Sequence, residues 1–191
     1  MELYKRVSMK DMLAQGLYEL MKSMPYDKIT IKQISNKTGV IRGTFYNHFY
    51  DKYEALEYLT YILMFEYNSS NKNIKDYSKL MQSILNNIEK EKEFFKHCFQ
   101  IEGQNGFESI LFNVFCKLLS DYLDSINIIF DNEAINQDLF VQINVNTIVF
   151  IIKTWMSKQP NKSAEEIYSI FSIVLQESAK DIINRLQKTQ K

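Results

Sequence analysis

Glycine and proline are scarce in this sequence, which has 5 glycines and 2 prolines among its 191 residues. Tight turns depend on these two residue types more than on most others, so the chain is poorly suited to β-hairpins. Hydrophobic residues make up 46% of the chain, and they recur every three or four positions, as on the buried face of a helix. The sequence therefore predicts an all-α fold of about nine helices.

Capping pairs predict where several helices of the first part of the chain begin. In each pair a short polar residue is followed three positions later by an acid or an amide; the pairs are Ser8–Asp11, Thr30–Gln33 and Asp51–Glu54. Gly39 supplies a tight turn between the second and third helices, because only glycine adopts a positive φ at little cost. Together with the apolar spacing, these signals predict helices at 8–22, 30–38, 41–49 and 51–67.

A polar run at 68–73 lacks apolar periodicity and is the best candidate for a linker. It divides the chain into an expected N-terminal domain at 6–67, which we call the head, and an expected C-terminal domain at 74–191, which we call the body. The alternative is a helix that runs through this segment into the second domain. Longer helices are expected in the body at 75–89, 92–102, 107–130, 138–158 and 163–187. The last of these opens with Ser163 and Glu166, a further capping box.

The segment 30–49 has the layout of a helix-turn-helix, in which the second helix enters the major groove of DNA while the first braces it. The residues expected in the core of this unit are Ile31, Ile34, Val40, Phe45 and Phe49. The residues then expected to face outward from the second helix are Arg42, Gly43, Thr44, Tyr46, Asn47 and His48.

This segment resembles the helix-turn-helix of the TetR family (TetR/AcrR type). The hallmark is a Gly-Val turn, a short helix ending in Thr-hydrophobic-Tyr-x-His-Phe, and a Lys at the next helix start. It is matched here by Gly39, Val40, Gly43, Thr44, Phe45, Tyr46, His48, Phe49 and Lys52. The resemblance covers about sixty residues, and the rest of the chain matches the family only in size and helicity. It implies a DNA-binding head of three helices and a larger helical body for ligand binding and dimerisation.

Individual roles on DNA follow from chemistry for some of these residues. Arg42 is expected to pair with guanine O6 and N7. Gly43 is expected to let the helix approach the groove closely, and Thr44 to meet a thymine methyl group or a phosphate. Residues 1–56 carry nine Lys and Arg against six Asp and Glu, a net charge of +3 in a chain of net charge zero, which suits a head that touches phosphate.

Other roles are implied by the resemblance. Tyr46 and Lys52 are expected to hold backbone phosphates, Thr30 to cap a helix that faces another phosphate, and Asn47 or His48 to reach a base or a phosphate. Tyr46 and His48 have an alternative, which is to pack between the second and fourth helices. Lys5 and Arg6 are expected to extend the contact from an N-terminal arm.

Ile41 departs from the family pattern, which commonly has Ser, Asn or Thr as the N-cap of the reading helix. Loss of such a cap typically costs about 1 kcal/mol. We therefore expect a frayed start to this helix in the free protein, and an Arg42 that is less rigidly aimed.

The body is rich in aromatic residues, which predict either core packing with a dimer face or a pocket for a small apolar or amphipathic ligand. The candidate ligand residues are Phe99, Phe112, Asn113, Gln142 and Asn146, of which the polar members equally suit a solvated surface. The last two helices are expected to form a homodimer interface, because the first of them is apolar around most of its circumference. The candidate interface residues are Ile148, Ile152, Trp155, Ile167, Ile170, Phe171 and Val174.

Several other classes of protein are disfavoured. There are only 2 His residues, no GxSxG motif and no phosphate-binding glycine loop, so we expect neither an enzyme nor a bound cofactor. Cys98 and Cys116 have no CxxC or His-rich surroundings, so we expect reduced core thiols and no metal site. The longest apolar stretch, 143–156, is interrupted by Asn144, Asn146 and Lys153, so we expect no membrane span and a cytoplasmic protein.

The function expected from these features is that of a DNA-binding regulator. The first hypothesis is a homodimeric repressor that a small effector releases from a pseudo-palindromic operator. The alternative is a DNA-binding co-regulator whose body docks another protein. No residue distinguishes repression from activation.

Overall fold

The computed structural model describes residues 8–65, 76–101, 106–130, 135–176 and 180–181. In these ranges the regular structure is entirely helical, which confirms the predicted all-α fold. The α-helices are α1 (Met9–Met21), α2 (Ile31–Lys37), α3 (Arg42–Tyr46), α4 (Lys52–Phe65), α5 (Tyr77–Lys90), α6 (Lys92–Cys98), α7 (Phe107–Ser125), α8 (Gln137–Lys158) and α9 (Ala164–Gln176), with a 3₁₀ turn at Tyr26–Lys28.

The helices of the head begin where the capping pairs predict. Ser8 Oγ accepts a hydrogen bond from the amide of Asp11, whose carboxylate accepts one from the amide of Ser8. Thr30 and Gln33 form the same reciprocal pair at the start of α2. These bonds satisfy amides that have no partner within the helix. The starts of these helices are therefore fixed by local sequence.

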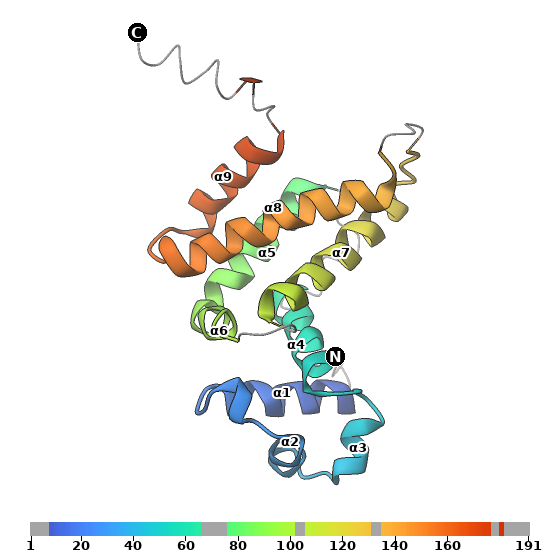
Figure 1. Cartoon of the computed structure of the whole chain (residues 1–191), viewed down its shortest axis with the longest axis vertical. Coiled ribbons are helices and arrows are strands. Elements are labelled where there is room, and N and C mark those ends of the chain that lie inside the picture. The colour runs from blue at the N-terminus through green and yellow to red at the C-terminus, as the bar shows by residue number, and fades with distance from the viewer. Residues whose placement is uncertain (1–7, 66–75, 102–105, 131–134, 177–179, 182–191) are drawn as a thin grey trace, which may run out of the picture.

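Figure 1 shows the head at one end of the molecule and the body at the other, with α4 running from the first into the second. In the head α4 packs against α1, and toward the body it packs against α5 and α7. Two hydrogen bonds strengthen this junction: Asn87 Nδ2 donates to the carbonyl of Met64 over 2.9 Å, and Tyr18 Oη donates to Glu91 Oε2 over 2.6 Å. Head and body are thus joined by apolar packing and by polar contacts.

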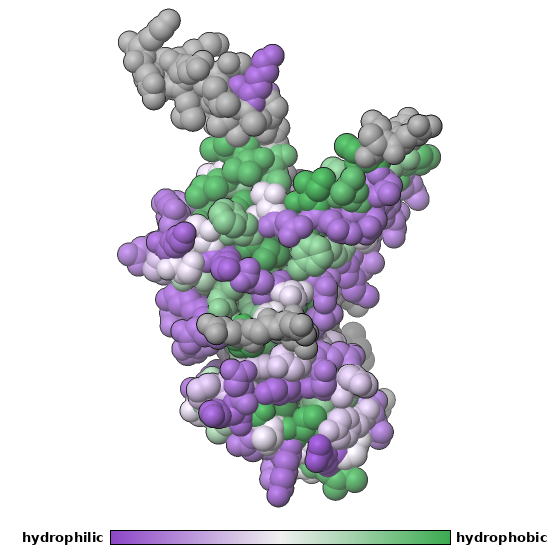
Figure 2. Space-filling view, viewed as in Figure 1, coloured by the Kyte–Doolittle hydropathy of each residue, from purple (hydrophilic) through white to green (hydrophobic). Residues whose placement is uncertain are grey.

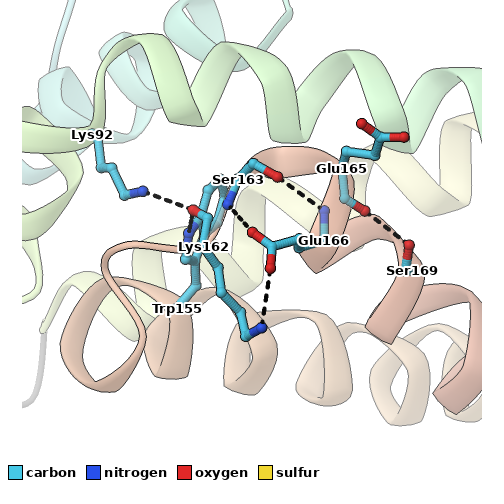
Figure 3. Close-up of polar contacts among 7 residues, drawn as sticks. All are labelled: Lys92, Trp155, Lys162, Ser163, Glu165, Glu166 and Ser169. Carbon is cyan, nitrogen blue, oxygen red and sulfur yellow. Dashed lines mark hydrogen bonds and ion pairs between the residues drawn. The ribbon is translucent and has the colours of Figure 1, made fainter.

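The body is a bundle in which α7 packs along α8, and α5 along α9. At the corner between α8 and α9, Trp155 Nε1 and Lys92 Nζ both donate to the carbonyl oxygen of Lys162, over 2.9 and 3.0 Å (Figure 3). The predicted capping box opens α9, since Ser163 and Glu166 exchange hydrogen bonds between side chain and backbone. The corner is therefore tied to α6 through Lys92.

Some predicted helix ends are wrong. The helix predicted to reach residue 130 ends at Ser125, because Asn127 takes a φ of 53° and the chain leaves the helix there. Asparagine adopts this conformation more readily than most residues. The helix predicted to reach residue 102 ends at Cys98. The predicted linker at 68–73, the N-terminal arm, and most of the predicted helix beyond Gln176 lie outside the described residues.

Helix α8 is long and apolar enough, by length and composition, to cross a membrane, and it alone among the described helices meets that test. It lies within the bundle, however, where eight of its residues are buried, including Val145, Ile152 and Trp155. Only 39% of its most apolar window is covered. The length and hydrophobicity of α8 are thus those of a core helix with an additional apolar surface.

Candidate nucleic-acid interface

The turn between α2 and α3 is fixed by backbone hydrogen bonds and by one glycine. Gly39 has a φ of 70°, and a Cβ atom added there would meet no other atom within 4 Å. Glycine is therefore required at position 39 because of the positive φ angle, and not because a larger side chain would clash with its surroundings. The amide of Val40 bonds to the carbonyl of Ser35 over 3.0 Å, which closes the turn and sets the direction of α3.

Aromatic packing holds α3 on the head. Phe45 and Phe49 are almost completely buried, at 0% and 1% exposure, and their rings lie 5.6 Å apart. The Phe49 ring also contacts the Tyr58 ring of α4 at 5.6 Å, and Lys10 Nζ of α1 lies over both of these rings. The short helix therefore takes its position from α1 and α4.

The outward face of α3 holds the residues that the helix-turn-helix pattern predicts there. Arg42, Gly43, Tyr46 and Asn47 are exposed, and Thr44 and His48 are half-buried. Of the residues predicted inward, Ile34, Phe45 and Phe49 are buried, and Ile31 and Val40 are half-buried. Tyr46 is 46% exposed, with its ring edge against Phe45, so it does not fill a space between α2 and α4.

Arg42 is held by Tyr46, one helical turn further along. Its Nη2 donates to the Tyr46 hydroxyl oxygen over 2.8 Å, and the guanidinium carbon lies 5.4 Å from the centre of the Tyr46 ring. Residues four apart share a helix face, so this contact is available without any tertiary structure. It gives Arg42 a defined orientation although Ile41 provides no side-chain cap for α3. The four-residue spacing of Arg42 and Tyr46 is the sequence signal from which this contact could have been predicted.

Gly43 has no packing neighbour that explains it. Apart from the chain neighbours and the backbone of α3, an added Cβ atom would meet only Ile41 Cδ1 among the described residues, at 3.9 Å, which is an ordinary contact distance. Glycine within a helix costs about 0.5–1 kcal/mol relative to alanine. Packing within the described residues therefore does not explain the glycine at this position.

Lys52 does not point freely outward. Its ammonium group donates to the backbone carbonyls of Tyr26, Asp27 and Ile29 over 3.1, 3.4 and 3.2 Å, and it lies 4.4 Å from the centre of the Tyr26 ring. Burial lowers the pKa of Lys52 from its ordinary value. The expected contact of Lys52 with a backbone phosphate stays a prediction. What the geometry adds is that three backbone carbonyls of the head already accept hydrogen bonds from its ammonium group. Sequence could not show this, because the acceptors lie more than twenty residues away.

Thr30 is first of all a helix cap. Its hydroxyl oxygen accepts a hydrogen bond from the amide of Gln33 and its hydroxyl donates to Gln33 Oε1 over 2.8 Å. The residue is exposed, so these bonds stabilise α2 at the surface of the head.

The predicted ligand residues are only partly brought together. Phe112, Asn113 and Asn146 line one surface hollow of about 410 Å³ between α7 and α8, together with Glu108, Ser109 and Val149. Phe99 lies elsewhere, with its ring 5.1 Å from that of Phe107. Gln142 is exposed and donates to Asp138 over 2.8 Å. A second hollow of about 460 Å³ lies where α1 meets α5 and α6, beside Tyr18 and Phe94. No sequence pattern predicted it, because its lining comes from helices that are distant along the chain.

Most of the predicted dimer residues belong to the core of the protomer itself. Exposure is 2% or less at Ile148, Ile152, Trp155, Ile167 and Phe171, so these five residues have no surface left for a second copy. Ile170 is half-buried, and Val174 is 44% exposed. The apolar side chains that α8 does expose are Leu139, Ile143 and Phe150. These residues are buried within the protomer because α8 packs against α6, α7 and α9 at once. The periodicity of the sequence does not show which apolar residues of α8 face these helices and which face a second copy.

Among the described residues, no group of three or more His, Cys, Asp or Glu side chains is placed to hold a metal ion. Burial raises the pKa of the Cys98 thiol well above its ordinary value, and the residue is fully buried.

The body of the chain matches a known family of regulators. A family model for TetR proteins, described as the transcriptional regulator C-terminal region, matches residues 75–177, which is more than half of the chain. This protein is a member of the TetR family. The match lies in the body, whereas the motif that suggested the family lies in the head, so the two signals are independent. The expectation that the body matches the family only in size and helicity is therefore wrong, because its sequence matches the family model as well.

Solved structures of TetR-type regulators share the fold. The dihydroxyacetone kinase operon activator DhaS is 19% identical, with a TM-score of 0.57 over 87% of this chain and 93% of its own. FadR of Thermus thermophilus, described as a TetR family transcriptional repressor in complex with lauroyl-CoA, is 16% identical, with a TM-score of 0.57 over 89% and 94%. At these identities the likeness concerns the fold alone. A search of curated protein sequences finds no significant match.

Proposed function

We propose that this TetR family member is a cytoplasmic homodimeric repressor that binds a pseudo-palindromic operator through its two heads. The observation that carries the proposal is the outward face of α3, where Arg42 is exposed and oriented by Tyr46. In a helix-turn-helix this face enters the major groove. An oriented guanidinium offers two parallel donors for guanine.

The remaining exposed residues suit the same surface. Asn47 and the partly exposed Thr44 and His48 supply hydrogen-bonding groups along α3, and Gly43 leaves room for close approach. Tyr46 and Thr30 are proposed to contact the phosphate backbone at the edges of the groove. Lys52 contributes by supporting the turn that precedes α2.

The test is a measurement of fluorescence anisotropy on labelled DNA from upstream of the gene, against a scrambled duplex, over a series of salt concentrations. We expect the protein to prefer its own DNA, and Arg42→Ala to reduce that preference by about 5- to 150-fold, the usual range for one bidentate base contact. Lys117→Ala, which removes an exposed charge from α7, is the matched control and should behave as wild type. Equal binding of both duplexes by wild type would refute the proposal.

The dimer is proposed to form through an apolar stripe on α8 and α9, which consists of Leu139, Ile143, Phe150 and Val174. These side chains are 42–68% exposed, and the three on α8 are spaced by four and seven residues, so they share one face. Phe150 is the most exposed of the four side chains, at 68%. A second copy related by two-fold symmetry would cover the stripe of one protomer with that of the other.

Light scattering after size-exclusion chromatography tests this interface. Phe150→Glu should shift the protein from dimer to monomer, because it places a charge in a desolvated contact. Gln82→Glu, on the exposed side of α5, should leave the dimer intact. A Phe150→Glu protein that remains dimeric would show that the stripe is not the interface.

A small apolar or amphipathic effector is proposed to bind the hollow between α7 and α8. The hollow is of suitable volume, and it combines the Phe112 ring with the amides of Asn113 and Asn146. The FadR structure was solved with lauroyl-CoA, so an amphipathic ligand has a precedent in the fold. Binding that favours a different spacing of the two heads would weaken operator binding by the coupling energy, typically 1–3 kcal/mol.

Adjacent residues at the start of α6 provide a route for that coupling. Glu91 accepts from Tyr18 of α1, while Lys92 donates to the corner between α8 and α9. We expect a movement of that corner to be transmitted to the head through these two hydrogen bonds. Effectors are found by screening amphipathic compounds for release of labelled DNA. Tyr18→Phe, which keeps the ring, should reduce release without changing DNA affinity in the absence of effector.

A second candidate function is docking of another protein by the body. The observation that favours it is a cluster of exposed isoleucines where α7 meets α8: Ile128, Ile129 and Ile135 are 46%, 86% and 42% exposed. If no compound releases the DNA, and if Ile129→Ser abolishes regulation in cells while DNA binding is kept, docking is the better account.

The direction of regulation needs its own assay, because DhaS is described as an activator and FadR as a repressor. A reporter fused to the bound promoter should be expressed more strongly when the gene is deleted. Weaker expression would identify an activator.

A further inference from the structure

We propose that Ile41 is a base-reading residue, whose side chain contacts the C5 methyl group of a thymine next to the guanine that Arg42 reads. The inference rests on the DNA-binding function proposed above and adds a specificity determinant to it. It is carried by the exposure of Ile41, by its position at the start of α3, and by its relation to Gly43.

The exposure of Ile41 is unusual for an aliphatic side chain. It is 77% exposed, although it lies directly beside the well-packed turn that holds α3. The other large hydrophobic residues exposed near α3, Tyr46 and Tyr50, carry hydroxyl groups that suit them to water. Figure 2 shows hydrophobic surface at the tip of the head, where the turn leads into α3. Ile41 therefore contributes little to the core of the head.

Its place in the chain is one where an aliphatic residue is a disadvantage. Ile41 is the N-cap of α3, with the extended backbone typical of that position (φ −79°, ψ 154°), and it makes no capping hydrogen bond through its side chain. Side chains cap other helices of this protein, for example Thr30 at α2, Asp76 at α5 and Asn136 at α8. A polar residue at Ile41 would stabilise the free protein, so isoleucine brings no benefit to folding here.

The Ile41 side chain leans over Gly43. Its Cδ1 atom lies 3.9 Å from the point that a Gly43 Cβ atom would occupy, and it is the nearest atom apart from the chain neighbours of Gly43 and the backbone of α3 itself. Ile41 and the bare backbone of Gly43 thus form one small apolar surface, and apart from the chain neighbours of Gly43, no other side chain of the described residues comes within 4 Å of that point. Both residues are unfavourable for an isolated α3, and both become useful if this surface meets another molecule closely.

The major groove offers one apolar partner, which is the thymine methyl group. Arg42 lies between Ile41 and Gly43 in the chain and is proposed to pair with guanine, so the methyl group would belong to a neighbouring base pair. Thr44 is the other candidate for this contact, and it is half-buried. Ile41 is both more exposed and more apolar.

The test removes the methyl group from the DNA and the side chain from the protein independently. The full-length protein first selects its preferred duplex from a randomised library. Each thymine of that duplex is then replaced singly by uracil, which lacks only the C5 methyl group, and the Kd is measured by anisotropy. We expect wild type to lose about three- to tenfold in affinity at one thymine of each half-site, next to a guanine, as burial of one methyl group implies.

The same set of duplexes is measured with Ile41→Ser and with Tyr50→Ser as the matched control. Ile41→Ser should show no uracil penalty at that thymine and the normal penalties elsewhere, while Tyr50→Ser should behave as wild type. Serine is a good N-cap, so Ile41→Ser should also unfold at the same temperature as wild type or higher, which separates loss of a contact from loss of the fold.

The inference is overturned if Ile41→Ser and wild type have the same uracil penalty at every thymine while the protein still prefers its selected duplex. In that case the proposed function stands and Ile41 reads no methyl group. If the library yields no preferred duplex, the proposed function itself fails, and this inference fails with it.

Discussion

Two glycines of the head offer a matched test of how α3 meets DNA. Gly16 lies in α1 and is buried against α2: an added Cβ atom would lie 2.5 Å from Thr38 Cγ2. Thr38 cannot easily turn away, because its hydroxyl donates to the carbonyls of Ile34 and Ser35 over 3.0 and 3.1 Å. At Gly43 the nearest described atom, apart from its chain neighbours and the backbone of α3, is Ile41 Cδ1 at 3.9 Å. Alanine therefore overpacks the first site and fits the second.

The two substitutions should have opposite effects on stability. Overpacking typically costs 1–3 kcal/mol, and alanine gains up to about 1 kcal/mol in a helix, so Gly16→Ala should lower the free energy of unfolding by about 1 kcal/mol net. Gly43→Ala should raise it by about 0.5–1 kcal/mol. Both are measured by urea unfolding followed by circular dichroism, at one protein concentration, because dimerisation links stability to concentration.

DNA binding should reverse this order. The Gly43→Ala methyl group would occupy space between α3 and the groove, and a clash of 1–3 kcal/mol corresponds to about a 5- to 150-fold loss of affinity. Gly16→Ala should bind DNA nearly as wild type under conditions where it is folded. If Gly43→Ala destabilises the free protein, or binds DNA as tightly as wild type, the argument that Gly43 serves close approach is wrong.

Three further outcomes are expected from the described contacts. Lys52→Met should lower the free energy of unfolding by about 1–3 kcal/mol, because three carbonyls lose their donor; urea unfolding measures this, and no change would show that the Lys52 contacts are dispensable. Burial raises the pKa of Tyr77 to about 12 from an ordinary value of 10.0, so the stability due to its neutral hydroxyl is complete below pH 10.0 and is lost as the pH rises through about 12. Stability measured over this range should fall less in Tyr77→Phe, and an equal fall would contradict the assignment. In a time course with a thiol reagent, Cys116 should react in the native protein and Cys98 only after unfolding, because Cys98 is buried whereas Cys116 is partly exposed. Burial raises the pKa of both thiols, that of Cys98 well above its ordinary value; equal rates would contradict this.

The parts of this structure that sequence predicted well are those fixed by neighbours along the chain. Ser8 and Thr30 cap the helices that follow them through residues three positions away, and Gly39 forms its turn by its own backbone conformation. The Arg42–Tyr46 contact belongs to the same class, and its spacing made it predictable although it was not predicted. A single asparagine, Asn127, ended α7 earlier than its apolar pattern indicated.

The features that sequence could not decide depend on which helices lie side by side. The apolar residues of α8 predict that the helix is buried. Which of them lie in the core, such as Trp155, and which lie at the surface, such as Phe150, is decided only by the positions of α6, α7 and α9. Lys52 is likewise identified as a support for the turn only because folding brings the carbonyls of Tyr26 and Ile29 to its ammonium group. Hydrogen bonds within one turn of helix are set by local sequence, whereas the direction that a side chain faces relative to a distant helix is set by the packing of the whole bundle.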